Sequence, residues 1–117
     1  MKFIFLILVL PLLDQQCKKE KSGIADNEVP TCIQVKIDSI RAQPVWNPPA
    51  EVNEYEYEGR KVYLFSSPCC DQYNQLFDSA CNYLCSPSGG YTGKGDQKCD
   101  GFFDNARHLR LVWKDER

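Results

Sequence analysis

Cysteine is the residue type in this sequence with the most chemical options. The chain has seven cysteines among 117 residues. Cys17 stands apart near the N-terminus, and the other six are enough for three disulfide bonds. So many cysteines in a short chain predict a disulfide-stapled domain in an oxidising compartment. The six disulfide candidates are Cys32, Cys69, Cys70, Cys81, Cys85 and Cys99.

The spacing of these cysteines limits how they can pair. Six cysteines allow about fifteen pairings, and excluding a strained bond between the neighbours Cys69 and Cys70 leaves about twelve. We expect one of these two to bond Cys32. The other is expected to bond a cysteine in the predicted hairpin over 73–85 or next to the glycine-rich loop at 89–96. Each bond would add about 2–4 kcal/mol, mainly by restricting the unfolded chain.

Metal binding and nucleophilic catalysis are the rival uses of cysteine. Cys69, Cys70, Cys81 and Cys85 could supply four thiolates to zinc, but they do not form two close-spaced pairs, and an oxidising compartment favours disulfides. A nucleophilic cysteine needs a base, and His108, in a predicted strand, is the single histidine. We expect a surface strand residue there, no metal, no cofactor and no catalytic residue.

A glycine-rich loop is the second distinctive feature. It fails the nucleotide-binding pattern, because Ser88 stands five residues before Gly93 and Gly95 follows Lys94. Its glycines suit either a tight structural turn or a contact with an anion or a peptide. The possible binding loop comprises Gly89, Gly90, Tyr91, Thr92, Gly93, Lys94, Gly95 and Asp96.

Carboxylates are scattered over the predicted loops. Most are expected to be turn and cap residues, although a pair acting as acid and base stays open. Asp96, Asp100 and Asp104 could bind calcium but lack the spacing of a calcium loop. The loop carboxylates are Asp71, Asp78, Asp96, Asp100 and Asp104.

One helix is expected to open the domain. Ile33, Ile37 and Ile40 follow helical spacing, which predicts an N-terminal amphipathic helix over 31–42 with Thr31 as its N-cap. Prolines from Pro44 onward end it, and the ring of Trp46 is expected to fill the edge of the core.

Strand patterns fill the rest of the domain. Residues 51–57 and 61–66 predict a hairpin with its turn at Gly59, and residues 73–78 and 82–85 predict a second hairpin. Residues 108–113 form a last strand, with Leu109, Leu111 and Trp113 expected on one face. The predicted class is α+β, with the helix packed on a small, mostly antiparallel sheet.

The N-terminus predicts export. Residues 3–13 are an apolar run preceded by Lys2, and its eleven residues are too few to span a bilayer, which takes about 20. The run resembles a bacterial lipoprotein signal, which implies a signal peptide over 1–16, an acylated Cys17 and a tether over 17–30. Gln16 departs from the small residue usual before the cysteine, and the alternative is an ordinary signal cut elsewhere.

Charge excludes one class of partner. The formal net charge is −2, and acidic and basic residues are well mixed. A nucleic-acid-binding face needs clustered Lys and Arg to neutralise phosphates, so nucleic acid is not an expected partner.

Two motifs carry a resemblance over about 32–115. The sequence Cys-Cys-Asp-Gln-Tyr-Asn at 69–74 and the loop at 89–96 resemble those of a family of small secreted or lipid-anchored bacterial proteins defined as a domain of unknown function. That family usually carries Gly-Asn before Cys85, whereas here Cys81 precedes Asn82. The pairing of Cys81 therefore stays open, including the case of a free thiol. The resemblance implies export and a compact domain, and no activity.

These observations favour a non-enzymatic module at a membrane surface. We expect the aromatic hairpin and the glycine-rich loop to contact an envelope protein or a wall component, since rigid aromatic side chains near turns are good anchors. One alternative is an exported protease inhibitor presenting residues 86–96, and another is a small envelope enzyme. The sequence does not define an oligomeric state.

Overall fold

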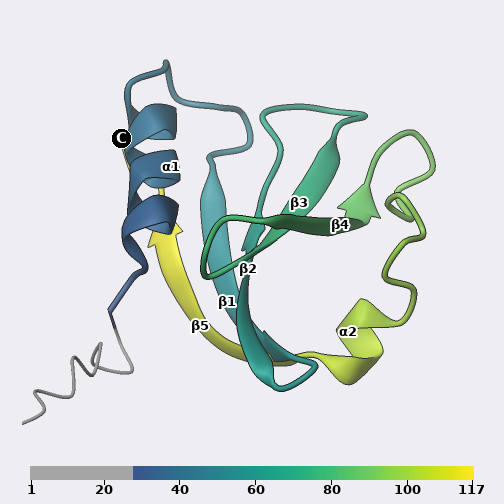
Figure 1. Ribbon diagram of the computed structural model, residues 1–117. Helices are drawn as coiled ribbons and strands as arrows, with labels where there is room; N and C mark the ends of the chain where they lie inside the picture. The colour runs from purple at the N-terminus through teal and green to yellow at the C-terminus, as the bar shows by residue number, and fades with distance from the viewer. Residues whose placement is uncertain (1–27) are drawn as a thin grey trace, which may run out of the picture.

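The computed structural model describes residues 28–117 as an α+β domain built on one antiparallel sheet (Figure 1). The predicted signal peptide, Cys17 and the tether up to residue 27 lie outside the described residues. No helix within 28–117 has the length and apolar character needed to cross a membrane. In chain order the elements are α1 (Thr31–Arg41), β1 (Glu51–Tyr57), β2 (Arg60–Phe65), β3 (Tyr73–Asp78), β4 (Tyr83–Gly89), α2 (Phe102–Asn105) and β5 (Arg107–Lys114).

The sheet has the strand order β4-β3-β2-β1-β5, and every neighbouring pair is antiparallel. The predicted hairpin turn is confirmed, because Glu58 and Gly59 both have positive φ and connect β1 to β2 directly. After β4, at one edge of the sheet, the chain crosses to the other edge, where β5 pairs with β1. This places the C-terminus beside α1 (Figure 1).

The first face of the sheet is covered by α1. Ile33, Ile37 and Ile40 are buried against it, as their spacing predicts. The expected N-cap role of Thr31 is wrong. Pro30 occupies that position with a φ of −53°, its carbonyl accepts the amide of Gln34, and no side chain caps the helix.

The second face is covered by the segment from Gly90 to Ala106, including the short helix α2. Phe102 is 1 % exposed and packs with Val62, Leu76 and Cys85. The sequence does not predict α2, because its four residues are too few to show a helical period. α1 therefore packs on one face of the sheet, and the loop segment that contains α2 packs on the other.

The last strand departs from its predicted pattern. Two register shifts interrupt its pairing with β1, so side chains do not alternate regularly. Val112 and Trp113 both pack against the α1 core, whereas Leu111 is 50 % exposed. The prediction that Leu109, Leu111 and Trp113 lie on one face is therefore wrong, because Val112 rather than Leu111 joins Trp113 at the core.

A buried polar group lies under α1. Glu54 is 2 % exposed and accepts a hydrogen bond from Arg110 across the β1–β5 pair, at 3.3 Å. Burial, followed by the hydrogen bond with Glu54, raises the pKa of the facing Tyr63 to about 12. The phenol therefore stays neutral, and the buried carboxylate has a cationic partner.

Three disulfides are present, and two of them attach a cover to the sheet. Cys32 of α1 bonds Cys81 in the β3–β4 turn, and Cys85 of β4 bonds Cys99 just before α2. Cys81 is therefore not a free thiol. These bonds indicate an extracellular or otherwise oxidising environment.

The third disulfide overturns the expected pairing, because Cys69 bonds its neighbour Cys70. The reason is position: both lie in the β2–β3 loop, at the opposite end of β3 from Cys81 and the start of α1. The six residues of β3 span about 20 Å, so Cys32 cannot reach both sites. Cys81 is held in place by its turn, where Asp78 accepts the amides of Ala80 and Asn82.

Replacing Cys32 and Cys81 together with alanine should lower the free energy of unfolding by about 2–4 kcal/mol, because this bond closes a long loop with a sequence separation of 49. Urea unfolding of the oxidised proteins measures it. The matched control is the double alanine variant at Cys69 and Cys70, whose bond closes no loop of chain and should contribute less than about 1 kcal/mol. Equal losses in the two variants would contradict this assignment.

Candidate functional site

A groove of about 320 Å³ lies between the C-terminal half of α1 and the adjoining ends of β2 and β3. Trp46 forms one wall and Tyr73 another, and Phe65 and Phe77 line the apolar part. Polar side chains from α1 and from the β2–β3 loop complete it. We call this the aromatic groove; its lining residues are Lys36, Ser39, Ile40, Gln43, Trp46, Phe65, Ser66, Ser67, Pro68, Gln72, Tyr73, Gln75 and Phe77.

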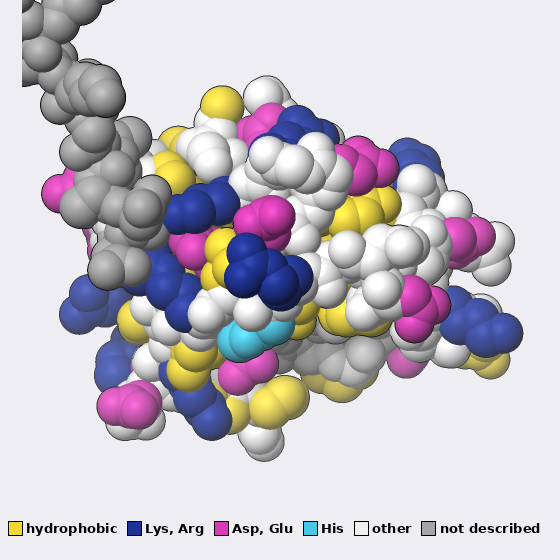
Figure 2. All heavy atoms as spheres, turned by 90° about the horizontal axis from the view of Figure 1, so that it is seen from below, with side chains coloured by type: hydrophobic (Ala, Val, Ile, Leu, Met, Phe, Trp, Pro, Cys, Tyr) yellow, Lys and Arg dark blue, Asp and Glu magenta, His cyan; other side chains and the backbone are white. Residues whose placement is uncertain are grey.

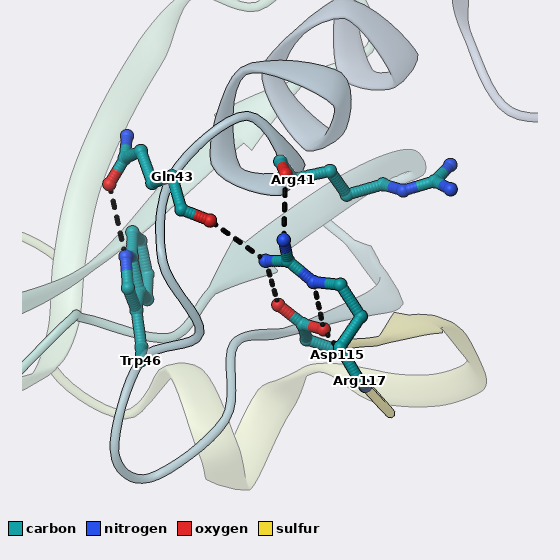
Figure 3. A network of polar contacts seen from close by, with 5 residues as sticks. All are labelled: Arg41, Gln43, Trp46, Asp115 and Arg117. Carbon is teal, nitrogen blue, oxygen red and sulfur yellow. Dashed lines mark hydrogen bonds and ion pairs between the residues drawn. The ribbon is translucent and has the colours of Figure 1, made fainter.

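The C-terminus of the chain supports the Trp46 wall (Figure 3). Arg117 donates hydrogen bonds to the carbonyl oxygens of Arg41 and Gln43, at 2.8 and 3.1 Å. Arg41 is the last residue of α1 and Gln43 lies two residues beyond it, at the end of the helix where a cation is favoured by the helix dipole. The Gln43 side chain then accepts the indole N–H of Trp46 at 3.1 Å.

Asp115 holds Arg117 in this position. Its carboxylate accepts two bonds from the Arg117 guanidinium, at 2.9 and 2.7 Å, and its backbone amide bonds Ala50. The hydrogen bond from Arg117 holds the pKa of Asp115 below its usual range, so the carboxylate is charged at neutral pH. The chain end thus fixes both the end of α1 and the connector that carries Trp46.

The glycine-rich loop supports the Tyr73 wall. Gly90 lies so close to Tyr73 that a Cβ atom at this position would overlap the ring, and its amide donates to the Gln72 carbonyl at 3.0 Å. A Cβ on Gly89 would meet the Asn74 amide nitrogen at 2.9 Å. The motif at 69–74 and the loop at 89–96, distant in sequence, are therefore packed together, and Asn74 also donates to Ser88 at 3.0 Å.

The predicted binding loop divides into a packed base and an exposed tip. Gly95 packs so tightly on the β4 backbone that no Cβ fits, and the Asp96 amide donates to the Ser86 carbonyl at 2.9 Å. The tip projects into solvent and holds Tyr91, Thr92, Gly93 and Lys94. Tyr91 is 91 % exposed. The glycines of the base serve the structure, which leaves only the tip free for an external contact.

Asp96 is occupied inside the loop. One oxygen accepts the Tyr83 hydroxyl at 2.8 Å and the other accepts the Lys98 amide at 3.0 Å. Burial opposes the charge, but the bonds from Lys98, Tyr83 and Ser86 outweigh it and lower the pKa of Asp96. Within residues 28–117, no three His, Cys, Asp or Glu side chains converge as metal ligands would.

The other predicted site residues are dispersed. His108 is exposed and bonds Asn53 at 2.9 Å, and its ring packs edge-on against Tyr55. Asp78 bonds its own turn. The six cysteines of the domain are all paired, so none is a thiolate nucleophile.

The hairpin of β1 and β2, which the sequence marks as aromatic, packs two of its tyrosine rings partly against the interior of the domain. The ring centres of Tyr55 and Tyr57 lie 5.1 and 5.0 Å from that of Phe102. Both rings pack against the cluster of buried residues around Phe102, on the face of the sheet opposite α1. The exposed aromatic side chains of residues 28–117 are Tyr73, Tyr83, Tyr91 and Phe103, at 48, 44, 91 and 53 % exposure. Phe103 packs edge-on against Tyr55 of the hairpin. Figure 2 shows acidic and basic side chains interspersed over another face, with no extended area of one sign.

The structure thus defines a small disulfide-bonded α+β domain with one aromatic groove between its helix and its sheet. The chain belongs to the family described as Domain of unknown function (DUF6970), whose model matches residues 38–115. This range includes both motifs and most of the groove, and the family resemblance is confirmed. No curated protein and no solved structure matches the chain.

A pair of glycines tests how the loop supports the groove. Gly90 and Gly93 have the same φ of +76°, but only at Gly90 would a Cβ meet Tyr73, whereas Gly93 has open space around it. Replacing either with alanine should cost about 1–2 kcal/mol of stability through backbone strain. Only Gly90→Ala should also shift the NMR resonances of the Tyr73 ring. An unshifted Tyr73 in Gly90→Ala would contradict the packing described.

Proposed function

We propose that the protein is a non-enzymatic binding module of the bacterial cell envelope that holds its ligand in the aromatic groove. The observation that carries the proposal is the convergence of the motif at 69–74 with the loop at 89–96. The motif supplies an exposed aromatic side chain, Tyr73, at the edge of a cavity, and Gly90 of the loop packs against its ring. Ligand sites are commonly concave, with an apolar lining and a few placed polar groups.

Anchoring at a membrane completes the proposal. The segment 1–16 acts as the signal peptide, Cys17 carries the lipid and residues 17–30 form the tether. Disulfides are consistent with export, and Lys18, Lys19 and Lys21 follow the cysteine in a polar stretch. Acyl chains contribute about 0.8 kcal/mol per buried methylene, so two or more give stable attachment.

Lipid attachment is tested by mass. The membrane-extracted full-length product should be heavier than the processed polypeptide by the mass of the acyl groups, and Cys17→Ser should lose that increment and leave the membrane fraction. A processed but unmodified wild-type mass would show that the anchor is wrong.

Groove binding is tested by photo-crosslinking in intact cells. A diazirine amino acid in place of Gln75, which is exposed in the groove lining, should give a discrete adduct on illumination. The matched control replaces Leu111, which is 50 % exposed and absent from the lining. The adduct at position 75 should disappear in the background of Tyr73→Ala. No adduct at 75, or the same adduct from position 111, would refute a role for the groove.

A second candidate function rests on the loop tip. The Cys85–Cys99 bond and the bond from Asp96 to Ser86 brace a loop whose tip exposes Tyr91 and Lys94. A stiff exposed loop is what a protease inhibitor presents to an enzyme. If this function holds, the protein inhibits trypsin-like enzymes through Lys94 or chymotrypsin-like enzymes through Tyr91, and the matching alanine variant raises the inhibition constant at least tenfold. No inhibition across a panel of both classes would eliminate it.

A further inference from the structure

The composition of the aromatic groove indicates the chemistry of its ligand. The lining contains no carboxylate and one cation, Lys36, whose ammonium lies 4.1 Å from the centre of the Phe77 ring. The lining also contains four aromatic side chains, those of Trp46, Phe65, Tyr73 and Phe77. The neutral hydrogen-bonding side chains number six and are Ser39, Gln43, Ser66, Ser67, Gln72 and Gln75. A lining of aromatic rings and uncharged polar groups suits a ligand that is itself polar and largely uncharged.

Four of the six polar side chains are available to a ligand. Among residues 28–117, no hydrogen bond occupies the side chains of Ser39, Ser67, Gln72 or Gln75, whereas Gln43 accepts from Trp46, and Ser66 accepts from the Glu51 amide. Hydroxyl and carboxamide groups each donate and accept. The free groups therefore match a ligand whose own groups also do both, at several neighbouring positions.

Saccharides meet both conditions. Their hydroxyl groups donate and accept, and their C–H faces can pack against aromatic rings, whose faces carry partial negative charge. We propose that the aromatic groove binds a glycan, with a sugar ring packed on Tyr73 or Trp46 and its hydroxyls bonded by Gln72, Gln75 and Ser67. This rests on the proposed function and names the class of ligand for the same groove. A groove of about 320 Å³ suits one segment of a chain rather than a long stretch.

An extended peptide fits the same groove less well. Aromatic grooves that bind proline-rich peptides rely on aromatic N–H and O–H donors to the peptide carbonyls. Here the Trp46 N–H is already donated to Gln43 at 3.1 Å, so the Tyr73 hydroxyl is the one aromatic donor that the lining offers to a peptide. The lining also offers no carboxylate to a basic side chain. The observations therefore favour a sugar over a peptide.

The experiment is a titration of the full-length protein, monitored by tryptophan fluorescence and by NMR shifts. The probes are chitotriose, cellotriose, trigalacturonate and a proline-rich decapeptide. We expect saturable binding of at least one trisaccharide in the millimolar range or tighter, with shifts at Trp46 and Tyr73. A preference for chitotriose or cellotriose would support the uncharged ligand inferred from the lining. A preference for trigalacturonate would show that Lys36 selects an acidic sugar and would overturn the inference of an uncharged one.

Variants locate the binding. Tyr73→Ala and the double variant Gln72→Ala with Gln75→Ala should each weaken binding at least tenfold, roughly the loss of one ring contact or of two hydrogen bonds. Tyr73→Phe keeps the ring and should stay within about threefold, and Tyr91→Ala, at the loop tip outside the groove, within about twofold. The thermal unfolding midpoint of each variant checks that it folds, and the exposure of these side chains makes loss of fold unexpected.

The outcomes separate this inference from the proposed function. Saccharide binding lost in Tyr73→Ala supports both. No saccharide binding, together with a groove-dependent crosslink to a protein in cells, overturns the glycan and leaves the binding module. Binding of the decapeptide alone also overturns the glycan. Saccharide binding unchanged in Tyr73→Ala and in the double glutamine variant shows that the sugar sits elsewhere and overturns the inference.

Discussion

The structure depends on the attachment of two short segments, α1 and the segment that contains α2, to the two faces of one sheet. A domain of this size buries only roughly 60–65 % of its unfolded surface, so its core alone leaves little margin over chain entropy. α1 covers one face and the segment before β5 covers the other, and each is joined to the sheet by one disulfide. The Cys32–Cys81 bond fixes the beginning of α1, and Arg117 fixes its end.

The groove follows from this arrangement of constraints. The first turn of α1 is bonded to the β3–β4 turn. The other end of α1 therefore lies near the opposite ends of the strands, where β2 and β3 meet their connecting loop. The aromatic groove lies there, between α1 and the β2–β3 loop. The two walls are set independently, one by Arg117 through Gln43 and one by Gly90 against Tyr73. Because α1 is fixed at both ends, the groove beside it has its aromatic rings at fixed positions.

Much of the fold could be predicted from local patterns. The spacing of Ile33, Ile37 and Ile40 defines α1, and Gly59 marks the first hairpin, because helical period and turn chemistry are properties of neighbouring residues. The face of Leu111 could not be predicted, since two register shifts in the β1–β5 pair depend on a partner about 55 residues away. The disulfide partners of Cys32 and Cys69 depend on which ends of β3 they meet, which no spacing reveals.

The candidate site was visible only in pieces. Both motifs were distinctive in the sequence, but their contact is a tertiary fact: Gly90 lies against Tyr73 because β4 pairs with β3. Of the glycines that suggested a binding loop, Gly89, Gly90 and Gly95 fit the backbone into tight spaces, whereas Gly93 has open space around it. Trp46 was expected at the edge of the core, and it does pack there while also lining the groove. Its hydrogen bond to Gln43 could not be inferred without the end of the chain.

Two motifs that are distant in the sequence together build one wall of the aromatic groove. NOE spectroscopy of the oxidised protein in solution tests it most directly. We expect cross-peaks between the Tyr73 ring protons and the α protons of Gly90, together with cross-peaks between Trp46 and Gln43. A Tyr73 ring with no cross-peak to Gly90, in a protein whose three disulfides are intact, would contradict it.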